Sequence, residues 1–172
     1  RGYVEVGYCS VMGTHDEVVR SLRPDNWQDN AYLNTWRIYQ TINGMEVTGD
    51  LDFSVDATFG FPLQDRRQIQ TNKGEGITME YGQLYKDDKP LIRLVAINKY
   101  AHWNFKPAAR VIWDFFRHFS RDMKTKKLMY TEWWLDITMA ANVSYEGLQP
   151  FLFLILYLKL LDFFDSQAGE KR

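Results

Sequence analysis

The sequence predicts an α/β fold, in which hydrophobic strands alternate with amphipathic helices. Residues 3–12 (YVEVGYCSVM) are rich in β-branched and apolar types and run into a glycine-containing turn, as a strand does before a functional loop. Residues 91–97 are apolar almost throughout, which is typical of a strand covered on both faces. A helix is predicted to start at residues 106–107 and to end near residues 120–122, because apolar side chains recur there at helical spacing. This stripe consists of Ala108, Val111, Ile112, Phe115, Phe116 and Phe119.

Weaker patterns predict the elements between these. Residues 27–42 carry apolar side chains at near-helical spacing, and Asn43-Gly44 is expected to cap the C-terminus of that helix, since glycine adopts a left-handed backbone easily. Glycines punctuate residues 45–76, which predicts loops with one or two short strands. Residues 77–85 and 91–98 flank a polar turn and predict a β-hairpin.

The 172 residues are enough for one domain with a core, which we place at residues 1–123, followed by a tail at 124–172. The tail opens on a basic run, interpreted as a solvated turn, and contains the apolar segment 151–158 (FLFLILYL). A membrane span needs about 20 apolar residues. The segment is therefore expected to be a packed or oligomer-forming helix, and membrane anchoring stays a lesser alternative.

The chain begins at Arg1 in a strand-like pattern, so we expect a fragment or a processed product, with any signal peptide upstream. The compartment stays open. A net charge of −1 gives no reason to expect nucleic acid as a partner. The lone Cys9 excludes an internal disulfide framework and a multi-cysteine zinc site. The three histidines lack metal-ligand spacing, so neither a metal nor a cofactor is expected, and His15 and His118 are expected to face solvent.

Two loops carry the candidate chemistry. Residues 12–19 follow the first strand, and residues 100–104 follow the strand at 91–97. Loops at the carboxyl ends of strands are where open α/β folds place their sites, so Asp16 and His102 can meet there. The carboxylate would accept the Nδ1 proton of His102 and fix its tautomer. It would also stabilise the imidazolium that forms when Nε2 takes a proton from a nucleophile.

The same loops resemble a known family. Residues 11–19 (VMGTHDEVV) are similar to the segment that carries the acid in α/β hydrolases, and residues 101–104 (AHWN) with 108–116 (AARVIWDFF) resemble the end of the polyhydroxybutyrate depolymerase and feruloyl-esterase-like branch. The resemblance covers about residues 3–122. It implies the C-terminal portion of an α/β-hydrolase fold, with a mostly parallel sheet and flanking helices. It also implies that Asp16 is the triad acid and His102 the general base.

The chain departs from this pattern at two positions and lacks one partner. Met12 stands where the family often has histidine, and Ala101 stands where glycine commonly precedes the catalytic histidine. No serine lies in a G-x-S-x-G elbow, and in that fold the nucleophile precedes the acid. We therefore expect the serine upstream of Arg1 and expect this chain alone to be inactive. Trp103 and Asn104 are candidate substrate-binding residues.

The function expected from these residues is that of a serine carboxylic-ester hydrolase acting through an acyl-enzyme. The resemblance implies a small-molecule or polysaccharide-linked ester as substrate, such as feruloyl or acetyl esters or a short polyester. A serine peptidase is the nearest variant. A non-catalytic binding or assembly module is the alternative from another class.

Overall fold

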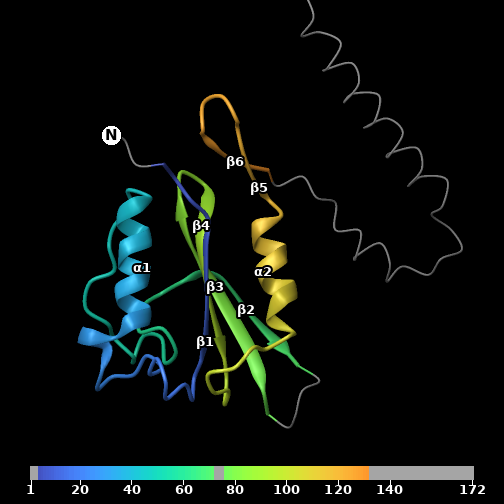
Figure 1. Cartoon of the computed structure of the whole chain (residues 1–172). Helices are drawn as coiled ribbons and strands as arrows, with labels where there is room; N and C mark the ends of the chain where they lie inside the picture. Colours follow the sequence, from blue (N-terminus) through green and yellow to red (C-terminus); the bar gives the residue numbers. More distant parts are fainter. Residues whose placement is uncertain (1–3, 72–75, 132–172) are drawn as a thin grey trace, which may run out of the picture. The chain divides into compact units, whose positions relative to one another are not determined.

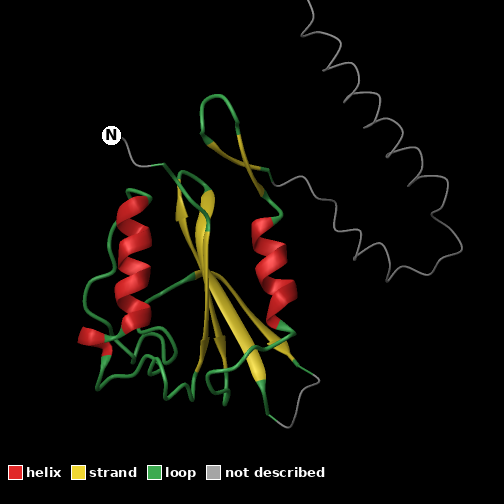
Figure 2. Cartoon of the chain, in the orientation of Figure 1, coloured by secondary structure: helices red, strands yellow, loops and turns green. Residues whose placement is uncertain are grey.

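A computed structural model describes residues 4–71 and 76–131, which belong to one compact unit. Its main sheet has four strands in the order β1-β4-β3-β2, with a helix on either side, and a separate two-stranded hairpin follows (Figures 1 and 2). The elements are β1 (Tyr8–Gly13), the 3₁₀ turn η1 (Trp27–Asp29), α1 (Ala31–Ile42), β2 (Gln64–Gln70), β3 (Thr78–Lys86), β4 (Lys89–Ile97), α2 (Ala108–Phe116), β5 (Phe119–Arg121) and β6 (Leu128–Tyr130). The predicted apolar helix at 151–158, like the rest of the tail from residue 132, lies outside the described residues.

The expected mostly parallel sheet of an α/β hydrolase is wrong for this unit. Only β1 and β4 pair in parallel, while β3 pairs antiparallel with both β4 and β2. The physical reason is local: β3 and β4 are joined by the two-residue turn Asp87-Asp88, and both residues have positive φ angles of 48° and 61°. So tight a turn can only reverse the chain, whereas parallel neighbours need a long crossover. The described residues therefore form a mixed α/β unit with a mostly antiparallel sheet.

Strand β4 is buried along both faces, as its apolar sequence predicts. Leu91 to Ile97 are all buried. On one face Ile92, Leu94 and Ala96 join the core that packs under α1 with Leu33 and Trp36. On the other face Val95 and Ile97 join the core under α2 with Ala108 and Val111. The alternation of side chains along a strand thus places one helix on each face of the sheet (Figure 1).

The first helix ends at Ile42, where the sequence predicts its end. The 3₁₀ turn η1 replaces its first residues, and α1 begins after Asn30, whose side chain accepts a hydrogen bond from the backbone N–H of Tyr32. Asn43 is the C-cap, and Gly44 follows with a φ angle of 63°. The predicted cap is therefore confirmed.

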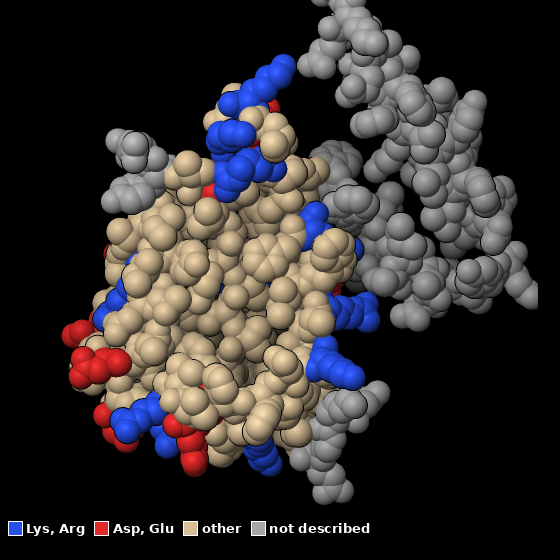
Figure 3. Space-filling view, in the orientation of Figure 1, with Lys and Arg blue, Asp and Glu red and all other residues tan. Residues whose placement is uncertain are grey.

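Helix α2 is shorter than the apolar stripe suggested. It ends at Phe116, and Phe119 lies in β5, paired with Tyr130. The stripe misleads because the ring of Phe119 still packs on that of Phe115, with centroids 5.0 Å apart, although it comes from a strand. The basic run 124–127 is the turn between β5 and β6, and its exposed lysines gather there (Figure 3), as predicted. Among the described residues, no helix combines the length and the apolar character needed to cross a membrane.

Candidate functional site: an aspartate–histidine pair beside a cavity

The two candidate loops leave the sheet together, because β1 and β4 run parallel and end side by side. Gly13, the last residue of β1, is in register with Ile97, the last residue of β4. The pairing continues into the loops, where the backbone N–H of Thr14 donates to the carbonyl of Ile97 (3.0 Å) and that of His15 donates to the carbonyl of Tyr100 (2.9 Å). The register of one parallel strand pair therefore fixes the acid-bearing loop against the histidine-bearing loop.

Gly13 permits this close approach. A Cβ atom at this position would lie 2.3 Å from the carbonyl oxygen of Tyr100 and 2.7 Å from that of Ala101, much closer than such contacts allow. Both obstacles are backbone atoms of the segment that leads directly into His102. The glycine before the acid loop is therefore required by packing between the loops rather than by its own backbone conformation.

Asp16 is held at four points by hydrogen bonds from described residues. Its side chain is only 1% exposed. Oδ1 accepts from the backbone N–H of Val18 (2.9 Å) and of Val19 (3.0 Å), while Oδ2 accepts from the hydroxyl of Tyr32 (2.8 Å) and lies 2.8 Å from Nδ1 of His102. Burial alone raises the pKa of the Asp16 carboxyl, but these hydrogen bonds together outweigh burial and lower the pKa below its ordinary value. Asp16 is therefore a carboxylate at neutral pH.

The contact between Asp16 and His102 sets the tautomer of the imidazole. A carboxylate can only accept, so Nδ1 of the neutral ring carries the proton and Nε2 keeps its lone pair. The side chain of His102 is 49% exposed, and no described residue hydrogen-bonds its Nε2. The sequence thus correctly paired these two residues, while their catalytic roles stay predictions.

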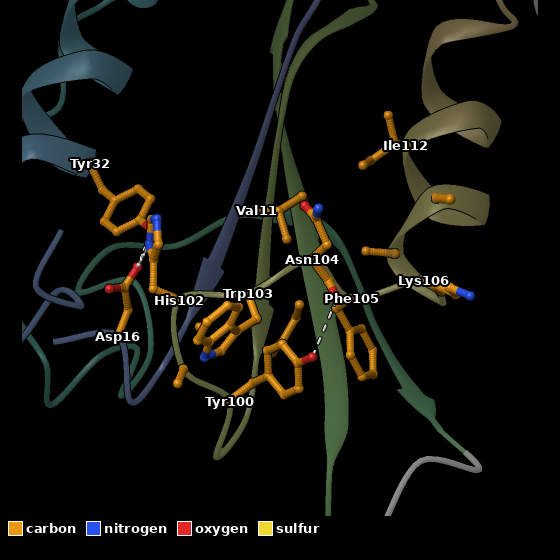
Figure 4. Close-up of a pocket in the computed structure, with 15 residues that line it drawn as sticks. Val11, Asp16, Tyr32, Tyr100, His102, Trp103, Asn104, Phe105, Lys106 and Ile112 are labelled. Carbon is orange, nitrogen blue, oxygen red and sulfur yellow. Dashed lines mark hydrogen bonds and ion pairs between the residues drawn. The ribbon is translucent and has the colours of Figure 1, made fainter. Parts of the chain in front are cut away.

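His102 lines a cavity of about 690 Å³ together with Asp16 (Figure 4). Most of its lining is apolar or aromatic and comes from β1, the histidine loop and α2. The lining residues are Val11, Gly13, Asp16, Tyr32, Ile97, Tyr100, Ala101, His102, Trp103, Asn104, Phe105, Lys106, Ala108, Ala109 and Ile112. Both candidate substrate-binding residues, Trp103 and Asn104, belong to this lining, and Trp103 is 81% exposed.

The described part of this lining holds no serine, threonine or cysteine that could act as a nucleophile. Ser10 is buried and accepts a hydrogen bond from Nε1 of Trp36 at 2.9 Å. Burial raises the pKa of the Cys9 thiol to about 11, so this group is not a thiolate at neutral pH. Ser144 and Ser166 lie outside the described residues.

Sequence reasoning missed Tyr32, whose phenol donates a hydrogen bond to the Asp16 carboxylate. Tyr32 falls inside the helix predicted at 27–42, and that position gave no hint of a partner 16 positions away. His15 is exposed, as expected. His118 does not lie on a helix as predicted but follows α2, where its Nδ1 contacts the carbonyl of Thr131 at 2.9 Å. No cluster of three or more metal-ligating side chains occurs within residues 4–71 and 76–131.

Comparison of the chain with protein-family models, with curated proteins and with solved structures finds no match. The function is therefore argued from the geometry of Asp16, His102 and the adjoining cavity.

Proposed function

We propose that Asp16 and His102 are the acid–base pair of a carboxylic-ester hydrolase that acts through an acyl-enzyme. The observation that carries the proposal is the 2.8 Å contact between a buried, ionised carboxylate and the imidazole Nδ1, beside a cavity that the same imidazole lines. A structural histidine needs neither a buried anionic partner nor access to a cavity. The combination matches the support that a general base requires.

The proposed reaction uses each nitrogen of His102 differently. Nε2 removes the proton of a serine hydroxyl while the serine oxygen attacks the ester carbonyl carbon, and the imidazolium then donates that proton to the departing alkoxide. Water attacks the acyl-enzyme in the same way, which releases the acid and regenerates the serine. Throughout, the Asp16 carboxylate accepts the hydrogen bond from Nδ1–H, stays ionised and stabilises the transient positive charge on the imidazolium. The serine is contributed from outside the described cavity lining.

The cavity supports an ester with an apolar portion as the substrate. Its walls are mostly aromatic and aliphatic, with few polar groups, which is typical of small-molecule sites. Trp103 and Asn104 are proposed to contact the substrate beside His102. The resemblance of residues 101–104 and 108–116 to the polyhydroxybutyrate depolymerase and feruloyl-esterase-like branch favours esters, either small or linked to a polysaccharide, over amides. Peptidase activity is the variant to be tested beside it.

A second candidate is a non-catalytic binding or assembly module. The described cavity lining holds no serine, threonine or cysteine, and this observation favours the binding module. In that case the Asp16–His102 contact would serve only to hold the two loops together. The two candidates differ in what the removal of the imidazole does to turnover.

The test compares His102→Ala with His118→Ala in the complete gene product. Hydrolysis of p-nitrophenyl acetate and butyrate and of matched anilides is measured with both variants. The esterase proposal predicts ester turnover that falls by several orders of magnitude in His102→Ala and stays unchanged in His118→Ala, because His118 lies away from the cavity lining. Faster cleavage of the anilides would favour the peptidase. Absence of turnover in the unaltered protein, or equal turnover in both variants, would overturn the proposal and favour the binding module.

A further inference from the structure

Tyr32 makes a contact that the proposed mechanism does not yet use. Its hydroxyl donates to Oδ2 of Asp16 at 2.8 Å, and this is the same oxygen that lies 2.8 Å from Nδ1 of His102. Tyr32 also lines the cavity (Figure 4). Burial and the hydrogen bond to Asp16 raise the pKa of Tyr32, so the phenol stays protonated and can only donate to the carboxylate at neutral pH.

The backbone around Tyr32 fixes where its hydroxyl points. The residue lies in the first turn of α1, where its N–H donates to the capping side chain of Asn30 at 3.0 Å. Its ring packs on the α1-side core, with its centroid 6.4 Å from that of the fully buried Trp36. The phenol is therefore anchored by a helix on one face of the sheet and reaches the carboxylate from a direction that neither loop supplies.

The two oxygens of Asp16 are held by different means. Oδ1 is held by two backbone amides of its own loop, and neither amide bonds to Oδ2. Among the described residues, Tyr32 is the one group other than His102 itself that bonds to Oδ2. The orientation of the oxygen that faces the imidazole thus depends on a single phenol.

We propose that Tyr32 is a positioning residue, whose hydroxyl holds Oδ2 of Asp16 where it accepts the hydrogen bond from Nδ1–H of His102. This inference rests on the proposed hydrolase function for its catalytic consequence, though not for the geometry itself. Without the phenol, Oδ2 keeps only its contact with the imidazole, so this oxygen and the ring that it orients are held less firmly. Small misplacements of a general base reduce the rate of the chemical step more than they weaken substrate binding.

The test replaces Tyr32 by Phe, which removes the hydroxyl and keeps the ring, and compares it with Tyr39→Phe. Tyr39 is on the same helix and is also half-buried, but its ring stacks on Tyr8 and lies away from Asp16. In the complete protein, Tyr32→Phe is expected to lower kcat for the p-nitrophenyl ester about tenfold to hundredfold with KM little changed, the loss expected for one hydrogen bond to a charged group. Tyr39→Phe is expected to leave both constants unchanged.

A second readout follows the imidazole directly, without turnover. The Nδ1 proton of His102 is expected to be visible by proton NMR in the unaltered protein and to exchange faster with water in Tyr32→Phe but not in Tyr39→Phe. An unchanged kcat in an active protein, or an unchanged His102 signal, would overturn the positioning role. If the unaltered protein and His102→Ala hydrolyse no ester, the proposed function fails on its own, while the NMR signal still decides whether Tyr32 positions the pair.

Discussion

Replacement of Gly13 by alanine is the sharpest structural test of how the two loops meet. The added Cβ would lie 2.3 Å from the carbonyl oxygen of Tyr100, whereas ordinary contacts begin at 3.4 Å. The backbone at Tyr100 must therefore move by about 1.1 Å, the difference between these two distances. That displacement is transmitted to His102, two residues further along the chain, and it also stretches the hydrogen bond from the N–H of His15 to Tyr100.

The magnitude follows from these contacts. Overpacking at a tight site costs about 1–3 kcal/mol, and the weakened backbone hydrogen bond adds about 1 kcal/mol, so a loss of about 2–4 kcal/mol in unfolding free energy is expected. A misplacement of about 1 Å at a catalytic group lowers the rate by about a hundredfold. The ester turnover of Gly13→Ala is therefore expected to fall by this factor even at temperatures where the protein stays folded.

Urea denaturation and ester turnover of the complete protein measure these two effects. Gly82→Ala is the matched control for stability, because its added Cβ would lie 2.4 Å from Cβ of Leu63. Gly82 lies on β3, a strand that contributes no described residue to the cavity lining. Gly49→Ala is the neutral control, since nothing lies within 4 Å of its added atom. If Gly13→Ala and Gly82→Ala lose the same unfolding free energy and also show the same ester turnover, Gly13 does not set the geometry of the site.

Three further predictions concern Asp16, Cys9 and Arg93. The folded pKa of Asp16 is lowered, so its carboxylate stabilises the fold fully above the unfolded pKa of about 3.9, and this contribution is lost as the pH falls through the folded value. As the pH is lowered below about 4, the urea midpoint should therefore fall less steeply for Asp16→Asn than for the unaltered protein. Equal slopes would contradict the lowered pKa of Asp16. Alkylation of Cys9 by iodoacetamide at pH 8 should be roughly two orders of magnitude slower in the native protein than in urea, because burial raises the thiol pKa to about 11, and similar rates would contradict this. Arg93 is buried with its guanidinium on the rings of Tyr81 and Phe115 and donates to the carbonyl of Val111 at 2.9 Å. Arg93→Lys should therefore lower the unfolding free energy by about 2–4 kcal/mol, and a loss below about 0.5 kcal/mol in urea denaturation would be inconsistent with that network.

Local sequence rules predicted much of the fold because they depend on neighbouring residues. The hairpin around residues 87–88, the buried strand at 91–97 and the cap at Asn43 follow from turn chemistry, uniform apolarity and left-handed glycine. The end of α2 was mispredicted because Phe119 continues the apolar stripe from a strand. The parallel sheet was mispredicted because it was inferred from the family resemblance, although the hairpin predicted at residues 77–98 already implied that β3 and β4 pair antiparallel.

In the candidate site, too, local sequence patterns predicted some residues, and others depend on tertiary packing. Asp16 and His102 each follow a hydrophobic strand, and that local pattern was enough to expect them at one edge of a sheet. The phenol of Tyr32 reaches the same carboxylate from a helix on one face of the sheet, so its role depends on tertiary packing alone. No periodicity or spacing in residues 27–42 distinguishes Tyr32 from Tyr39, although only Tyr32 touches the carboxylate.

A double-mutant cycle in the complete protein tests the central claim most directly. Ester turnover is measured for Asp16→Asn, His102→Ala and the variant that carries both. Since Asp16 is proposed to act only through His102, the double variant should be no slower than His102→Ala alone, as expected for residues that work as one unit. A double variant slower than His102→Ala by the full factor lost in Asp16→Asn would show that the two residues act independently, and would contradict the proposed acid–base pair.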